Sequence, residues 1–116
     1  MANNQRVRET FNDGWIKIKT QKTRRNELGK KVGFEDTDVA PLKYKNVSMR
    51  DSDITTMDAM GSKLTKKIKT PFHPIAKKFN KDKYFIVIND VRYNVIYVDY
   101  DNFYTYFYLE SVGDYS

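Results

Sequence analysis

Residues 84–110 are YFIVINDVRYNVIYVDYDNFYTYFYLE, and they contain three runs of strand-forming residues separated by two turns. β-branched and aromatic residues, which favour strands, fill residues 84–88, 91–100 and 103–109. Only Asn89 and Asp90 separate the first two runs, and both tolerate the positive φ angles of a two-residue hairpin turn. A second turn is predicted over residues 99–102. The C-terminal end of the chain is therefore predicted to form three consecutive antiparallel strands.

The last of these strands has two chemically different faces. One face is formed by Phe103, Thr105, Phe107 and Leu109, and the other by Tyr104, Tyr106 and Tyr108. Side chains along a strand alternate between its two sides, so the two sets belong to opposite faces of the sheet. We interpret this strand as amphipathic, with an unusually aromatic polar side.

An opening hairpin is predicted near the N-terminus. In residues 15–23, Ile16 and Ile18 alternate with lysines, which is typical of a strand with one face in water. Residues 24–33 then form its turn, because they contain a glycine of the kind that tight hairpins favour. We expect residues 32–34 to return as a short paired strand.

Two further strands are predicted in the middle of the chain. Residues 39–47 have strand character, but Pro41 confines their start to a sheet edge or to the beginning of a strand, because proline lacks a backbone N–H group. Residues 63–72 alternate lysines with other side chains and form a lysine-rich strand, which Pro71 and Pro74 terminate.

Residues 46–61, which we call the middle segment, interrupt the strand pattern. They are mostly polar, with a few methionines and an isoleucine scattered among them. We interpret the middle segment as a long loop. The alternative is a helix of one or two turns, capped by Ser52 or Asp53 and ended by Gly61.

Together these elements predict an all-β fold: a small antiparallel β-barrel or sandwich of about six strands, with one long polar loop and little helix. The chain of 116 residues has room for one modest core. We expect a flexible N-terminal arm over residues 1–14, a β-barrel domain over residues 15–110 with its projecting loop at residues 46–61, and a C-terminal tail over residues 111–116.

Composition argues against several classes of protein. Hydrophobic residues make up 40% of the chain and charged residues 31%, which indicates a folded protein with no apolar span long enough to cross a membrane. The N-terminal residues lack the apolar core of a signal peptide, so we expect synthesis and retention in the cytoplasm. The chain has no cysteine, one histidine (His73) and no glycine-rich phosphate loop. We therefore predict no catalytic residue, no cofactor and no metal site, and a protein that is not an enzyme.

Charge is distributed in blocks along the chain. Lysine and arginine number 21 against 15 acidic residues, for a net charge of +6. The net charges of residues 1–33, 34–61, 62–83 and 84–116 are +6, −3, +7 and −4. Such alternation is expected where opposite faces of neighbouring copies meet head to tail, although a solvated surface would also produce it.

The aromatic residues of the C-terminal strands are candidate interface residues. The candidates are Tyr93, Tyr97, Tyr104, Tyr106 and Tyr108, together with Lys66 and Lys67. Tyrosines beside lysines could stack on single-stranded nucleic acid, but Arg92 is the only basic residue after position 83, and stacked bases need cations nearby. Tyrosine is also common in protein interfaces, because it offers a large contact area at a low entropy cost. We favour a protein interface.

The order of these elements resembles that of the head-closure proteins of long-tailed bacteriophages, also called stoppers or head-tail joining proteins. The resemblance covers residues 15–110. Its carriers are the opening strand and turn over residues 16–29, the polar middle segment, the strand Lys63–Thr70, and a closing run in which Tyr93, Val95 and Val98 form a Tyr-x-Val-x-x-Val pattern before the final aromatic strand.

This resemblance implies a structural protein of the virion, made in the host cytoplasm and placed at the head-tail interface. Proteins of this family are small β-barrels that assemble as a ring, commonly a dodecamer, beneath the portal and adaptor rings after DNA packaging. A loop between strands projects into the channel and retains the packaged double-stranded DNA. The opposite face receives the tail-side connector or tail terminator protein. No membrane is involved.

On this chain the resemblance places the channel-gating loop in the middle segment. The gating residues would be Ser48, Met49, Arg50, Asp51, Asp53, Ile54 and Met57. In a ring, each of these side chains recurs around the axis, so modest apolar groups converge into a plug and the arginines form a ring of charge. Two alternatives remain open: another small virion protein, such as a tail terminator or minor capsid protein, and a nucleic-acid-binding β-barrel.

Overall fold

The computed structural model describes residues 10–115, excluding the side chains of residues 23, 24, 32 and 34. Within this part of the chain, six antiparallel strands form one sheet, accompanied by an α-helix and a short 3-10 helix. In chain order the elements are β1 (Gly14–Arg25), β2 (Lys31–Asn46), α1 (Asp51–Ala59), β3 (Lys66–Pro71), η1 (Pro74–Lys78), β4 (Tyr84–Ile88), β5 (Val91–Tyr100) and β6 (Tyr104–Asp114). The predicted all-β class with little helix is confirmed.

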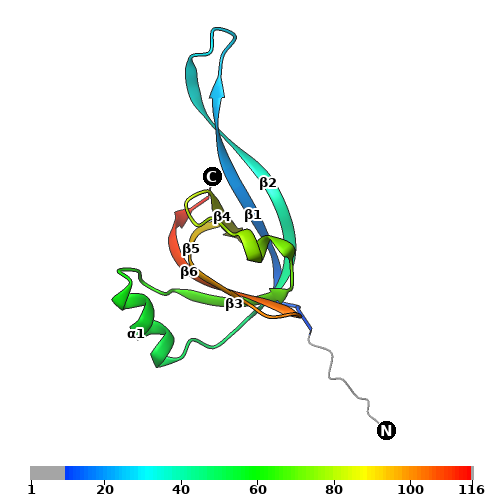
Figure 1. The fold of residues 1–116 in the computed structure, drawn as a ribbon, viewed down its shortest axis with the longest axis vertical. Coiled ribbons are helices and arrows are strands. Elements are labelled where there is room, and N and C mark those ends of the chain that lie inside the picture. The colour runs from blue at the N-terminus through cyan, green and yellow to red at the C-terminus, as the bar shows by residue number, and fades with distance from the viewer. Residues whose placement is uncertain (1–9, 116) are drawn as a thin grey trace.

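The sheet closes on itself as a barrel (Figure 1). Its neighbour order is β1-β2-β3-β6-β5-β4, and β4 pairs back with β1. The chain therefore forms two three-stranded meanders, and the pairs β3–β6 and β1–β4 join them. This closure decides between the two predicted architectures in favour of the barrel, which leaves fewer unpaired strand edges than a sandwich.

The core fills the inside of this barrel and draws on every strand. Its buried members are Ile16, Ile18, Tyr44, Ile68, Ile86, Ile88, Val95, Phe107 and Leu109. Each such side chain stabilises the fold by about 1.5–3 kcal/mol relative to leaving it in water. Of the face predicted for the last strand, Thr105, Phe107 and Leu109 are fully buried, whereas Phe103 precedes β6 in a turn and is 72% exposed.

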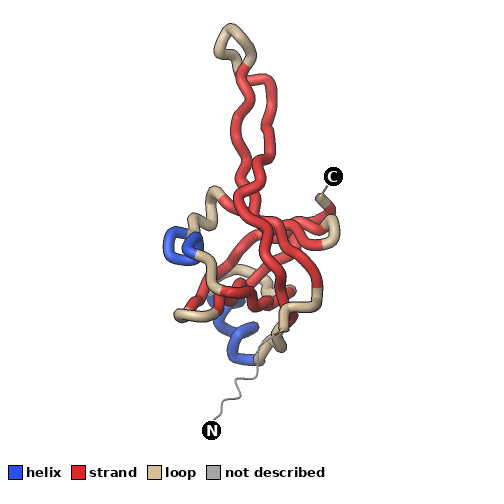
Figure 2. The backbone as a smooth tube through the Cα atoms, turned by 90° about the vertical axis from the view of Figure 1, so that its right-hand side faces the viewer, coloured by secondary structure: helices blue, strands red, loops and turns tan. Residues whose placement is uncertain are grey.

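The hairpin β1–β2 extends well beyond the barrel (Figures 1 and 2). β1 pairs with β4 only over Lys17–Thr20, and β2 pairs with β3 only at Lys45 and Asn46. Beyond Thr20 the two strands therefore pair only with each other, and they leave the barrel as a two-stranded ribbon. We call residues 21–36 the arm. The sequence predicts a hairpin here, but not that it projects.

β2 corrects two predictions. Residues 32–34 and 39–47, which were expected to be separate strands, belong to one strand of 16 residues. Pro41 does not begin this strand but lies inside it, opposite Lys17. The expected sheet edge is nevertheless present, because β2 reaches β3 only at its last two residues and has no strand on its other side at Pro41. Such an edge position is where a strand tolerates a proline, which lacks the N–H group.

The C-terminal hairpins follow the prediction at their turns but not at their end. Asn89 and Asp90 have φ angles of 49° and 64°, as a two-residue hairpin turn requires. β6 continues to Asp114 and pairs there with Val91, so the tail expected over residues 111–116 is mostly strand. The flexible N-terminal segment was expected over residues 1–14. Its residues 1–9 lie outside the described residues, and Phe11 packs its ring against Tyr104.

The middle segment contains a helix rather than only a loop. α1 covers nine residues and follows Arg50, which occupies the N-cap position. The Asp53 carboxylate accepts a hydrogen bond from the backbone N–H of Arg50 over 3.0 Å, so Asp53 supports the helix start from its third position rather than capping it. The preferred interpretation of this segment as a loop is therefore wrong, and the alternative of a short helix ended by Gly61 is close to the observed structure.

Candidate functional site

Pairing of β3 with β6 brings the lysine-rich strand beside the tyrosine face. Lys67 lies opposite Tyr108, and Lys69 lies opposite Tyr106. The ammonium groups of Lys67 and Lys69 lie 4.8 and 5.6 Å from the centres of these two rings. Distances in this range give cation–π attraction. A strip of alternating cations and aromatic rings therefore runs along the outer face of the barrel.

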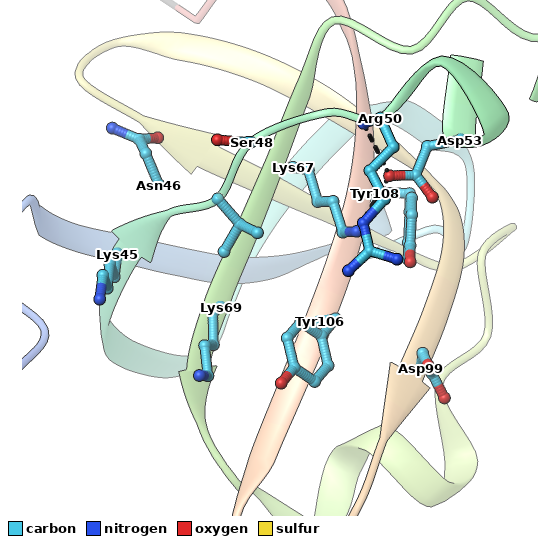
Figure 3. A pocket seen from close by; sticks show the side chains of 11 residues that line it. Lys45, Asn46, Ser48, Arg50, Asp53, Lys67, Lys69, Asp99, Tyr106 and Tyr108 are labelled. Carbon is cyan, nitrogen blue, oxygen red and sulfur yellow. Dashed lines mark hydrogen bonds and ion pairs between the residues drawn. The ribbon is translucent and has the colours of Figure 1, made fainter. Parts of the chain in front are cut away.

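This strip forms the floor of an open groove of about 630 Å³, and the residues that lead into α1 form one wall (Figure 3). The groove is lined by Lys45, Asn46, Val47, Ser48, Arg50, Asp53, Lys67, Lys69, Asp99, Tyr106 and Tyr108. Its charged groups are four cations and two carboxylates. The groove therefore combines net positive charge with exposed aromatic edges, a chemistry that suits anionic, ring-containing or phosphate-bearing partners.

One ion pair attaches the start of α1 to the groove floor. The Nζ of Lys67 lies 3.0 Å from Oδ2 of Asp53, and only 8% and 16% of the two side chains are exposed (Figure 3). Burial by itself lowers the pKa of Lys67, but its hydrogen bonds with Asp53 and Tyr108 outweigh that effect and leave the pKa raised. The pKa of Asp53 is lowered, because hydrogen bonds from the Arg50 backbone and from Lys67 outweigh its burial. Both groups are therefore charged near neutral pH, and we call this ion pair the latch.

A small apolar cluster holds the rest of the helix. Met57 is buried against Leu64 and Ile96, and Tyr108 packs beside them. Ile96 faces this outer cluster because it follows the inward Val95, and a register shift between Val95 and Tyr97 leaves it without a cross-strand partner, so that Tyr97 faces outward as well. A bulge of this kind turns two successive side chains toward one side of the sheet. α1 therefore rests on the barrel through one apolar side chain and the latch.

The structure divides the seven predicted gating residues into two groups. Ser48, Met49, Arg50, Asp51 and Ile54 are exposed, and Arg50 and Ser48 also line the groove. Asp53 and Met57 instead hold α1 on the barrel, and Met57 is only 4% exposed. In this structure Met57 is therefore packed within its own chain, while the expectation that Met49, Ile54 and Met57 converge in the plug of a ring stays a prediction.

The predicted interface residues also separate. Tyr106, Tyr108 and Lys67 line the groove. Tyr97 is 46% exposed and contacts the ring of Tyr108 with 5.6 Å between ring centres. Tyr104 lies at the barrel end beside Lys69, 4.0 Å from its Nζ to the ring centre.

Tyr93 and Lys66 do not belong to this surface. Tyr93 packs against the barrel core, and the Nζ of Lys66 lies over the ring of the buried Tyr44 at 5.6 Å. Both residues follow the inward side of their strands, so strand alternation excludes them from the outer face.

Sequence reasoning singled out Arg50 and Lys67, two of the four cations of this groove, but missed the other two and the arrangement that gathers all four. The acidic block after residue 83 argued against nucleic acid, but the lysines that neighbour the tyrosines come from β3, a different part of the chain. Lys45, Lys69 and Asp99 were not singled out, and they join the groove from β2, β3 and β5. The only signal for them in the sequence is the alternation of lysines over residues 63–69, which places Lys67 and Lys69 on one face.

In comparisons with known proteins, no family model and no curated protein matches this chain. Within the described residues, no group of three or more His, Asp or Glu side chains is arranged to hold a metal ion. Neither helix in the described part of the chain has the length and apolar character needed to span a membrane.

Proposed function

We propose that this protein closes the head of a long-tailed bacteriophage. In this role it sits as a ring at the head-tail interface of the virion, beneath the portal-side adaptor ring, and retains packaged double-stranded DNA. Its other face receives the tail-side connector or tail terminator protein. The observation that carries the proposal is a small closed barrel whose middle segment contains a helix, α1, that rests on the barrel through the latch and Met57.

Weak attachment suits a gate, because a gate must leave one position and take another. In a largely buried ion pair the cost of desolvation offsets most of the attraction, and a single apolar side chain contributes about 1.5–3 kcal/mol, so release of α1 into water costs only a few kcal/mol. Contacts with neighbouring copies in a ring can supply that much. The exposed Met49 and Ile54 would then form the plug, and Arg50 would attract the phosphates of the DNA end.

The test uses DNA-filled heads that carry portal and adaptor but no tail. We expect the purified protein to co-sediment with these heads and to protect their DNA from added nuclease. The gating variant is Met49→Ser with Ile54→Ser, which removes two exposed apolar groups and leaves the latch and Met57 in place. It should bind the heads as the natural sequence does, but retain less DNA.

Met60→Ser is the matched control, because Met60 belongs to the same segment and is 49% exposed, but is not among the gating residues. It should retain DNA normally. If the natural protein does not associate with the heads, the head-closure role is refuted. If it associates and the gating variant retains as much DNA as the control, the plug is not formed by these residues. If six copies bind each head, rather than the number of copies in the adaptor ring, the result would favour a tail terminator.

A second candidate function, a nucleic-acid-binding barrel, is favoured by the groove. Lys67, Lys69, Tyr106 and Tyr108 place cations beside aromatic rings on one face, as single-strand binders do. Base stacking on an aromatic ring contributes about 1–3 kcal/mol, so Tyr106→Ala should weaken binding of a fluorescent oligothymidylate at least fivefold. Binding should also weaken steeply with salt. Salt-dependent binding without any association with heads would make this the function of the protein.

A further inference from the structure

The tip of the arm is a hydrogen-bonded turn that exposes one apolar side chain. Oδ1 of Asn26 accepts hydrogen bonds from the backbone N–H groups of Leu28 and Lys30, both over 2.9 Å. Gly29 supplies the left-handed conformation that closes the turn, with φ of +77°. This arrangement leaves Leu28 90% exposed. Among the described large hydrophobic side chains that are exposed, Leu28 is therefore the most exposed, and the backbone that carries it is held by hydrogen bonds.

Cations surround this leucine. Lys22, Arg25, Lys30 and Lys31 are exposed at or near the tip, against two exposed acidic residues, Glu27 and Glu35, the second of which lies opposite Lys22. The guanidinium of Arg25 donates a hydrogen bond to the backbone carbonyl of Gly29 over 3.0 Å, so this cation is fixed within the turn. The tip is thus an apolar point within a positive rim.

The arm residues whose side chains the structure describes form no core of their own. The core cluster found among the described residues contains no member from residues 21–36. A two-stranded ribbon without a packed face is marginally stable in water, and both of its edges offer unpaired backbone groups. An arm of this kind gains most when another surface covers it.

A complementary surface lies at the end of the barrel remote from the tip, and we call it the aromatic end. It is formed by Phe72, Asp99, Tyr100, Asp101 and Phe103. Phe103 is 72% exposed and Tyr100 43% exposed, and Phe72 contacts Tyr100 with 6.0 Å between ring centres. Exposed apolar clusters with a polar margin mark interaction sites more often than isolated exposed residues do.

Two carboxylates give this end its matching charge. Asp101 accepts hydrogen bonds from the backbone N–H groups of Phe103 and Tyr104, both over 2.8 Å, and these bonds hold its pKa below the usual range. Asp99 is also exposed. Two cations also lie at this end: the Nζ of Lys77 lies 5.7 Å from the centre of the Phe72 ring, and that of Lys69 lies 4.0 Å from the centre of the Tyr104 ring. The complement to the cationic tip therefore comes from Asp99 and Asp101 alone.

We propose that the arm tip of one copy docks on the aromatic end of a second copy, with Leu28 against Tyr100 and Phe103 and the rim cations facing Asp99 and Asp101. The two surfaces lie at opposite ends of the molecule, so one chain cannot join its own (Figure 1). The contact is heterologous, so its repetition from copy to copy gives either a closed ring or an open filament. The inference rests on the self-assembly part of the proposed function. A nucleic acid is the less suitable occupant, because phosphates offer no apolar surface to Leu28.

Engineered disulfides test this contact, because the chain has no cysteine of its own. The variant Leu28→Cys with Phe103→Cys, at high concentration under mild oxidation, should form a ladder of covalent oligomers on a non-reducing gel. A mixture of the two single variants should form mainly the mixed dimer. Lys30→Glu with Lys31→Glu, added to the Leu28→Cys chain, should reduce this product at least fivefold, and Asp99→Lys in the Phe103→Cys chain should restore it.

The control pairs Leu28→Cys with Thr55→Cys, an exposed position on α1 away from the aromatic end. It should give only random products. The inference is overturned if the control pair forms as much ladder as the Leu28→Cys, Phe103→Cys pair, or if neither pair forms one. It is also overturned if no mixed dimer forms and the Lys30→Glu, Lys31→Glu variant instead loses oligonucleotide binding. If the protein binds heads but forms no ladder, only the proposed arm contact is refuted. If it forms a ladder but does not bind heads, only the head-closure function is refuted.

Discussion

Thr70 and Thr105 face each other across β3 and β6 inside the barrel, and both are fully buried. The hydroxyl of Thr70 donates a hydrogen bond to the carbonyl of Pro71 over 2.9 Å, whereas Oγ1 of Thr105 has no partner. A buried hydroxyl without a partner costs about 1–3 kcal/mol, and a made hydrogen bond contributes about 1 kcal/mol.

We therefore predict opposite effects for two isosteric substitutions. Thr105→Val should raise the free energy of unfolding by about 1 kcal/mol, and Thr70→Val should lower it by about 1 kcal/mol. Urea denaturation of both variants measures the difference. Equal effects of the two substitutions would contradict the assigned hydrogen bonding.

The latch should respond to pH at both ends of the scale. Because the pKa of Asp53 is lowered on folding, its stabilisation is complete above the ordinary aspartate pKa of about 3.9 and is lost as the pH falls through the lowered value. Because the pKa of Lys67 is raised, its part is complete below about 10.4 and is lost as the pH rises through the raised value. We expect the Met57 methyl resonance to shift with pH below about 4.

Asp53→Asn is the control for this titration, because it removes the charge and keeps an oxygen that can accept from the Arg50 backbone. In this variant the acidic transition of the Met57 resonance should be absent, and the α1 amides should exchange several-fold faster at neutral pH, for a loss of about 1 kcal/mol. An unchanged transition would show that another group releases the helix.

At the scale of elements, Tyr115, the residue that follows β6, fixes the base of the arm. The hydroxyl of Tyr115 donates a hydrogen bond to Asp36 over 2.6 Å, and its backbone N–H donates to the carbonyl of Asp90 over 2.7 Å. The hydrogen bond to Asp36 also raises the pKa of Tyr115, so the phenol stays protonated at neutral pH. Lys19 lies over the Tyr115 ring and pairs with Asp38.

Tyr115→Phe should therefore loosen the arm and leave the barrel unchanged. The arm base should become more mobile in backbone NMR relaxation, and the free energy of unfolding should fall by about 1 kcal/mol, since one partly buried hydrogen bond is lost. Loss of order throughout the barrel would mean that Tyr115 supports the fold rather than the arm.

At the scale of the whole molecule, the barrel and the arm are separable. Gln21 pairs with Asp36 at the arm base, so a two-residue Asn-Gly turn can join these residues in place of residues 22–35. Because the core lies outside the arm, the shortened chain should unfold cooperatively with a free energy within about 1 kcal/mol of the natural value. Urea denaturation checks the fold, and sedimentation velocity should show the loss of any self-association. A shortened chain that does not fold would show that the arm is part of the folding unit.

The candidate site shows where sequence patterns stop being informative. Alternation predicted that Tyr104, Tyr106 and Tyr108 share a face, and it grouped Lys67 with Lys69. No local pattern could predict that these two faces adjoin, because that depends on β3 pairing with β6 across about 40 residues of chain. The bulge at Ile96 could not be predicted for the same reason, because a register shift exists only between two paired strands.

The sequence by itself determined the all-β class, the hairpin at Asn89 and Asp90, and the inward set of the last strand, because turn chemistry and side-chain alternation act within a few residues. Only the tertiary structure decided that the sheet closes, that β1 and β2 leave it as the arm, and that Lys67 and Asp53 meet beneath α1. These features depend on which strands pair and where their pairing stops. That choice follows from packing the whole core at once, and no segment carries it alone.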